Sequence, residues 1–150
     1  MFALPLIARA RLWPERLGAG EPYGADTRIE DYLEAGILRK TGQTNRGNEL
    51  LTKIAEYTRV HMHAENTQHL IGAFALRDLG RNSDALELLR NWTRREPENP
   101  GARWSLMVFQ KRKSKARALE GSLRLSTLSR SNGDQDFVLM ADVVRMGLGN

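Results

Sequence analysis

The side chains best suited to bind a metal ion or to transfer protons are three histidines, His61, His63 and His69. His61 and His63 are two residues apart, so on a helix they would point to different sides. A zinc site on a helix needs ligands three or four residues apart and a further ligand elsewhere. The spacing therefore predicts no metal site, and it places the histidines in a solvated turn between helices.

Other catalytic groups also lack the partners that they would need. The chain contains no cysteine, which excludes thiolate metal sites, disulfides and a cysteine nucleophile. None of the G-x-S-x-G, Walker or H-E-x-x-H patterns occurs. Acidic residues fall mostly on predicted outer faces, without a pair placed in a pocket. The sequence therefore predicts no catalytic residues, no enzyme activity and no cofactor.

A basic segment carries the excess charge of the chain, whose formal net charge is +5. Residues 103–130 hold eight lysines and arginines against one acid, Glu120, and the densest part is residues 111–117. Such a run can bind phosphate, which keeps a nucleic-acid-binding module open as an alternative. The competing interpretation is a solvated turn with cations at the C-terminus of a helix. Because no aromatic residues are interleaved for base stacking, we predict no nucleic-acid partner.

The sequence gives no indication of a membrane segment. Its longest apolar stretch, residues 1–8, contains Pro5 and is too short to span a bilayer. Arg9 and Arg11 follow this stretch, whereas a signal peptide carries its positive charge in front. We therefore expect a cytoplasmic protein without membrane insertion, and the absence of cysteine suits a reducing compartment.

The elements that must position any site are helices. Residues 1–27 are rich in proline and glycine and are expected to form an irregular extension. Helical periodicity begins near Thr27, which forms a capping box with Glu30, and the first helix ends at Gly42. A second helix is expected over about residues 45–61.

The next two helices are expected near residues 65–79 and 82–95, and they carry the most informative spacing. Gly80, Ala85 and Pro97 follow the pattern of a tetratricopeptide (TPR) repeat. Glycine ends the first helix of such a hairpin, a small residue lets the two helices approach closely, and proline ends the second. One hairpin cannot bury its own apolar face, so neighbouring hairpins must stack on it.

A third hairpin begins after residues 99–101, and a last helix is expected over residues 136–146. No segment alternates as a strand would. The predicted fold is therefore all-α, with a TPR-like stack of three helical hairpins over residues 28–150 and a C-terminal helix that caps the stack.

In such a stack the first helix of each hairpin lines a concave groove, which suits an amphipathic helix of a partner. The residues that fall at groove-facing positions by their distance from the helix ends are Tyr32, Leu70, Phe74, Arg77, Trp104 and Val108. For the apolar members of this set, an ordinary position in the core is the alternative interpretation.

The order of these segments resembles the YscG/PscG family, the chaperones of the needle subunit in bacterial type III secretion. The resemblance spans about residues 30–147 and rests on residues 32–35, 41–43, 54–57, 70–86, 118–131 and 137–146. None of these pieces is a diagnostic motif; the weight lies in their order. Residues 1–27 have no counterpart in the family, and residues 111–115 replace a shorter and less basic junction.

The resemblance implies a chaperone in the bacterial cytoplasm that cradles the apolar C-terminal helix of a needle-forming subunit and keeps it monomeric. It also implies a small helical co-chaperone, which completes a heterotrimer. We place that contact on the first hairpin, which has no preceding repeat, at Ile29, Leu33, Ile37, Ile54 and Tyr57. A general TPR-like adaptor that binds another amphipathic peptide is the alternative function.

Overall fold

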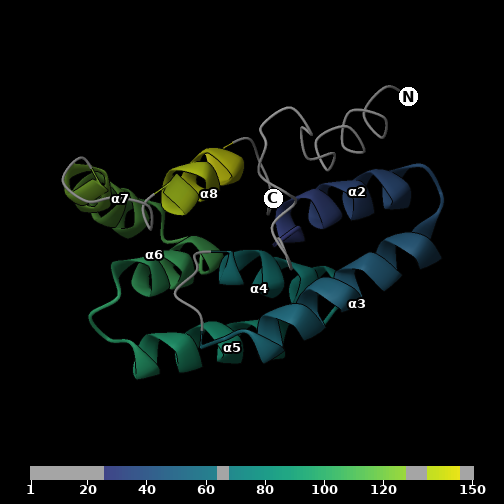
Figure 1. Ribbon diagram of the computed structural model, residues 1–150, viewed down its shortest axis with the longest axis horizontal. Coiled ribbons are helices and arrows are strands. Elements are labelled where there is room, and N and C mark those ends of the chain that lie inside the picture. Colours follow the sequence, from purple (N-terminus) through teal and green to yellow (C-terminus); the bar gives the residue numbers. More distant parts are fainter. Residues whose placement is uncertain (1–25, 64–67, 128–134, 146–150) are drawn as a thin grey trace, which may run out of the picture.

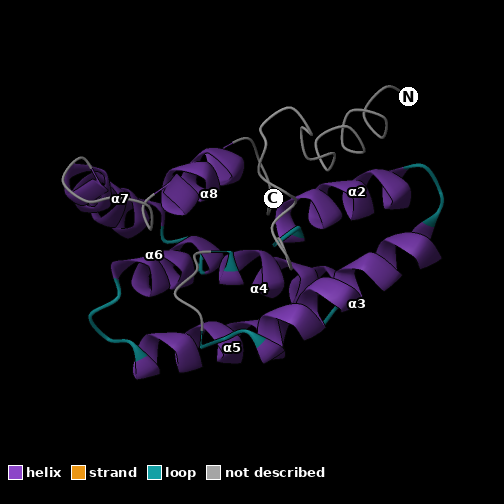
Figure 2. Ribbon diagram, in the orientation of Figure 1, coloured by secondary structure: helices purple, strands orange, loops and turns teal. Residues whose placement is uncertain are grey.

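All regular structure in the described part of the chain is helical, which confirms the predicted all-α class (Figure 2). The computed structural model describes residues 26–63, 68–127 and 135–145, so the expectations for residues 1–25 lie outside it. The helices are α2 (Arg28–Lys40), α3 (Thr44–Val60), α4 (His69–Asp78), α5 (Asn82–Arg95), α6 (Pro100–Phe109), α7 (Lys113–Thr127) and α8 (Gln135–Arg145).

Consecutive helices pack in pairs: α2 against α3, α4 against α5 and α6 against α7. The first helices of the pairs also touch one another, because α4 contacts both α2 and α6. The second helices contact the following pair, with α3 on α4 and α5 on α6. As a result α4 lies at the centre of the molecule (Figure 1) and is buried along most of its length.

The last helix lies at a different place from the expected one. We expected it to cap the end of the stack, whereas α8 lies over the side of α4 and α6 that faces away from α5 (Figure 1). It contacts α7 and buries Met140, Ala141 and Val143. The chain thus places one of its own helices on the surface that the sequence assigned to a partner.

The start of α2 also differs from the prediction. Thr27 occupies the N-cap position, but its side chain makes no capping bond and its hydroxyl donates instead to Asp31 at 3.4 Å. The backbone N–H of Arg28 is satisfied by the carboxylate of Asp26 at 3.2 Å. A carboxylate at this end is favoured because it opposes the positive end of the helix dipole. The predicted capping box with Glu30 is therefore wrong.

The first helix of each pair ends in the same backbone motif. Gly42, Gly80 and Lys111 have φ angles of 85°, 80° and 58°, and they follow α2, α4 and α6 respectively. After α4, the N–H of Gly80 bonds to Arg77 and that of Arg81 to Leu76, both at 2.8 Å. The same pair of bonds recurs after α2 and α6. This Schellman motif favours glycine, so Lys111 is strained where the two other turns are not.

The variant Lys111→Gly is expected to raise the free energy of unfolding by about 1 kcal/mol, because it removes the left-handed strain. Gly80→Ala is expected to lower it by about the same amount. The effect in Gly80→Ala comes from the backbone alone, because a Cβ at Gly80 has nothing within 4 Å. Urea unfolding of the two variants checks both signs, and a loss of stability in Lys111→Gly would contradict the assignment.

A polar network ties α2, α3 and α4 together inside the core. Arg28 is 3% exposed, and its side chain forms a forked ion pair with Asp26, with a closest distance of 2.6 Å. Its Nη1 atom donates to Thr58 at 3.0 Å and faces His69 Nδ1 at 3.1 Å. Tyr57 lies under the guanidinium, 5.3 Å from ring centre to Cζ. The network thereby fixes α4 against α2 and α3.

Candidate functional site

Four helices enclose a cleft of about 650 Å³ on the side of α4 and α6 where α8 lies. We call it the α4–α8 cleft. Its apolar lining comes from α4, α6, α7 and α8, namely Phe74, Trp104, Val108, Phe109, Ala116, Ala141 and Val144. Its charged lining consists of Arg77, Lys111, Lys113, Arg117, Glu120 and Arg145. An apolar floor with a charged rim is the arrangement that an amphipathic helix or peptide recognises.

The structure brings four of the six predicted groove residues into this cleft: Phe74, Arg77, Trp104 and Val108. Phe74 and Trp104 are only 2% and 1% exposed, so they support the floor more than they reach solvent. Val108 is half-buried and more accessible. Leu70 does not line the cleft and is fully buried in the core.

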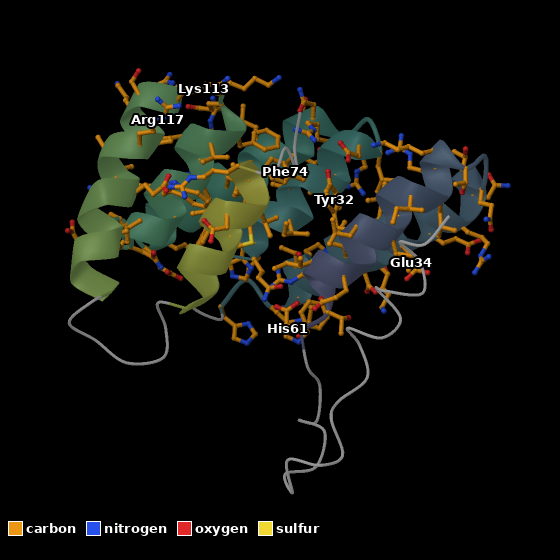
Figure 3. The ribbon with its side chains drawn as sticks, turned by 90° about the horizontal axis from the view of Figure 1, so that it is seen from above. Tyr32, Glu34, His61, Phe74, Lys113 and Arg117 are labelled. Carbon is orange, nitrogen blue, oxygen red and sulfur yellow. The ribbon has the colours of Figure 1, made fainter. Side chains whose placement is uncertain are left out.

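An aromatic row runs from α2 through α4 to α6. The ring of Phe74 lies 6.3 Å from Tyr32 and 6.1 Å from Phe109, measured between centroids. Arg77 lies over the face of Phe74 at 4.9 Å. Figure 3 shows Tyr32 on α2 and the basic residues of α7 at opposite sides of this face, with Phe74 between them. Tyr32, although outside the cleft lining, thus continues its floor.

Tyr32 is fixed by a strong hydrogen bond. Its hydroxyl donates to Asp78 Oδ2 at 2.6 Å, and Arg77 binds the other oxygen of the same carboxylate at 3.0 Å. Burial raises the pKa of Tyr32, and the hydrogen bond and negative charge of Asp78 raise it further. Tyr32 therefore stays protonated and serves as a rigid donor that links α2 to the end of α4.

The residues predicted to contact a co-chaperone divide into two groups. Ile29 and Ile54 are buried in the core between the helices. Leu33 is 38% exposed, and Ile37 and Tyr57 are half-buried. The surface that this hairpin offers therefore centres on Leu33 and Ile37. Tyr57 is engaged inside the chain, because it stacks on His61 at 3.9 Å and contacts Arg28.

The histidines do not share one environment, and the prediction of a solvated turn is wrong for His69. His61 and His63 follow the end of α3, and His61 Nδ1 bonds to the backbone oxygen of Tyr57 at 2.8 Å. His69 is fully buried, with its ring edge-on to Trp92 at 4.8 Å. Among the described residues, no cluster of three histidine or acidic side chains could hold a metal ion.

A second cleft, of about 830 Å³, lies between α3 and α5 and was not expected from the sequence. Ala55, Leu76 and Leu88 contribute to its apolar part. Its charged residues have both signs, namely Arg59, Arg81, Arg94 and Arg95 together with Glu56, Asp84 and Glu87. Arg81 and Asp84 already pair with each other at 2.7 Å. This cleft thus lacks the one-sided charge of the α4–α8 cleft.

Sequence reasoning missed Phe109, the α7 residues and the α8 residues of the α4–α8 cleft. Only the α7 residues show a pattern in the sequence that could have revealed them, because they recur at helical spacing on one face: Lys113, Ala116, Arg117, Glu120 and Gly121. The α8 residues line the cleft only because α8 packs against helices that are distant in sequence, and no local sequence pattern predicts that packing.

Comparisons with known proteins do not extend these observations. No family model matches the chain, and neither the curated proteins nor the solved structures contain a significant match. Within the part of the chain that is described, no helix has the length and apolar character to cross a bilayer.

Proposed function

We propose that this chain is a non-catalytic binding protein that holds an amphipathic helix of a partner in the α4–α8 cleft. The observation that supports this most is the position of α8. An amphipathic helix of the chain itself lies on the face of α4 and α6, and an apolar cleft remains beside it. A cleft of this kind, with an apolar floor and a charged rim, suits the apolar stripe of a further amphipathic helix.

The arrangement of the pairs supports a TPR-like stack as the scaffold. In such a stack the first helices line the binding face and the second helices lie behind them. The contacts of α4 with α2 and α6, and the same Schellman turn after each of these helices, agree with a repeated hairpin. The repeat spacing of Gly80, Ala85 and Pro97 points the same way.

The family resemblance supports a specific partner, the apolar C-terminal helix of a type III secretion needle subunit. Such a subunit assembles through apolar helices, so covering one helix removes a driving force of about 25 cal/mol per Å² of apolar area. The chain would act as a chaperone in the bacterial cytoplasm and keep the subunit monomeric. A small helical co-chaperone would complete a heterotrimer at the α2–α3 hairpin, where Leu33 is exposed.

The variant Gly121→Phe is expected to weaken partner binding by more than about tenfold without unfolding the protein. Gly121 lines the cleft, and a Cβ at this helical position meets nothing within 4 Å. A side chain placed here starts in open space at the wall of the cleft, so we expect a phenylalanine ring to occupy the cleft without displacing the core. Replacing a helical glycine also favours the folded state. Isothermal titration with the C-terminal peptide of the needle subunit measures the change.

The matched control for this experiment is Ala118→Phe. Ala118 is exposed on the same helix and does not line the cleft. We expect it to bind the peptide as the natural chain does. Equal binding by Gly121→Phe and Ala118→Phe, with circular dichroism showing both folded, would place the binding site elsewhere.

A further inference from the structure

We infer that the α4–α8 cleft selects an acidic amphipathic helix, and that Lys111, Lys113 and Arg117 determine this preference. The inference rests on the proposed function of the cleft and adds the chemistry of the partner. It follows from three observations. Three cations on the rim have no acidic partner among the described residues, the basic residues disfavour the turn and the helix start that carry them, and two of them are four residues apart on one helix.

The cations on the rim differ in whether an acid already engages them. Arg77 binds the neighbouring Asp78 at 3.0 Å, and Arg145 binds Glu120 and Asp142. By contrast, Lys111, Lys113 and Arg117 are exposed, and no ion pair engages them within the described part of the chain. Glu120, the acid in the cleft lining, is engaged by Arg145, so it opposes an acidic partner less. The rim presents an excess of positive charge over an apolar floor.

The basic residues occupy positions where they destabilise the turn after α6 and the first turn of α7. One interpretation of the run 111–117 from the sequence placed its cations in a solvated turn at a helix C-terminus, where they are favourable. The structure instead starts α7 at Lys113, with no acid in its first turn, so Lys113 and Lys115 lie at the positive end of the helix dipole. Lys111 occupies a left-handed position that the equivalent turns give to glycine. Locally unfavourable residues that gather at one cleft are typical of a functional surface.

The spacing of the cations matches a helical ligand. Lys113 and Arg117 are four residues apart on α7 and both line the cleft. Figure 3 shows them on α7, at the edge of the face that also carries Phe74. A partner helix that packs its apolar stripe on Phe109 and Val108 would bring an adjacent stripe of Asp or Glu, spaced by three or four residues, beside these two cations. An acidic ligand would also compensate the charge at the α7 N-terminus.

The test uses two fluorescein-labelled helical peptides of about 20 residues, with the same leucine and alanine stripe and with either Glu or Lys beside it. Fluorescence anisotropy with the full chain is expected to show at least about tenfold tighter binding of the Glu peptide in about 0.15 M salt. This preference should shrink in about 1 M salt. The double variant Lys113→Glu/Arg117→Glu should reverse it.

The double variant Arg90→Glu/Arg103→Glu is the control, because it changes the net charge equally at exposed positions that do not line the cleft. It should retain the preference for the Glu peptide. Should the Glu variant lose its helical circular dichroism, Lys113→Gln/Arg117→Gln replaces it and should abolish the preference.

Three results would overturn the inference, and they differ in what they imply. Equal binding of both peptides, unaffected by the α7 variants, would reject charge selection and leave helix binding intact. No binding of either peptide would reject the proposed function itself. Tighter binding of single-stranded DNA or RNA than of the Glu peptide, lost in the α7 variants, would assign the basic rim to nucleic acid.

Discussion

Replacing Arg28 with alanine is expected to lower the free energy of unfolding by about 3 kcal/mol, because it leaves the buried end of an ion pair unsatisfied. The guanidinium binds Asp26 through a fork and Thr58 through Nη1, and it packs on Tyr57. Breaking a buried pair by removing one partner costs about 3–5 kcal/mol, and we expect the lower end because Asp26 retains some contact with solvent. The expected fall in Tm is roughly 6–12 °C.

Lys40→Ala provides the comparison, since Lys40 is exposed at the end of the same helix and should change the stability by less than about 0.5 kcal/mol. Thermal unfolding followed by circular dichroism compares the two variants. A Tm for Arg28→Ala within about 2 °C of that for Lys40→Ala would mean that the network contributes little.

The same ion pair gives a pH dependence of definite sign. Burial alone would raise the pKa of Asp26, but the hydrogen bonds and charge of Arg28 outweigh it and lower that pKa below its ordinary value of 3.8. The stabilisation is therefore present above that value and is lost as the pH falls through the lowered pKa. Asp26→Asn should remove this part of the acid sensitivity.

Replacing Gly72 with alanine is the second change with a large expected effect, a loss of about 3 kcal/mol from overpacking. A Cβ on Gly72 would lie 2.2 Å from Thr58 Oγ1 and 2.5 Å from Thr58 Cβ. Both residues are buried where α3 meets α4, and rotating the Thr58 side chain does not move its Cβ atom, so the helices must separate. Urea unfolding should show the loss as a lower midpoint at unchanged slope.

A second substitution tests the cause of this loss. Thr58→Gly removes all three atoms that the new Cβ would meet. The double variant Gly72→Ala/Thr58→Gly should therefore be more stable than the sum of the two single losses predicts, with a coupling of at least about 1 kcal/mol. Additive losses would show that α3 and α4 do not meet as described.

Several local features of the fold were predictable because they depend on neighbouring residues. Gly42 and Gly80 end their helices as expected, since only glycine adopts the left-handed turn without strain. The five helices from α2 to α6 begin and end within a few residues of their expected limits. The start of α4 differs more, since it begins at His69 and not near residue 65.

The features that depend on distant residues were not predictable. Arg28 contacts Thr58 and His69, which are 30 and 41 residues away, so nothing near Arg28 in the sequence indicates that it is buried. The amphipathic pattern of α8 shows that one of its faces is buried, but it does not indicate which apolar surface of the protein that face packs against. One local feature was also missed: Lys111 could not be recognised as the third turn residue, because lysine rarely takes a left-handed conformation.

The assembly of the needle subunit in the presence of this chain tests the central claim most directly. Light scattering would follow the purified subunit alone, with an equimolar amount of the natural chain, and with an equimolar amount of Gly121→Phe. We expect the natural chain to suppress assembly and to form a 1:1 complex with the subunit, and Gly121→Phe to restore most of the assembly. A subunit that assembles at the same rate with and without the natural chain would contradict the proposed chaperone function.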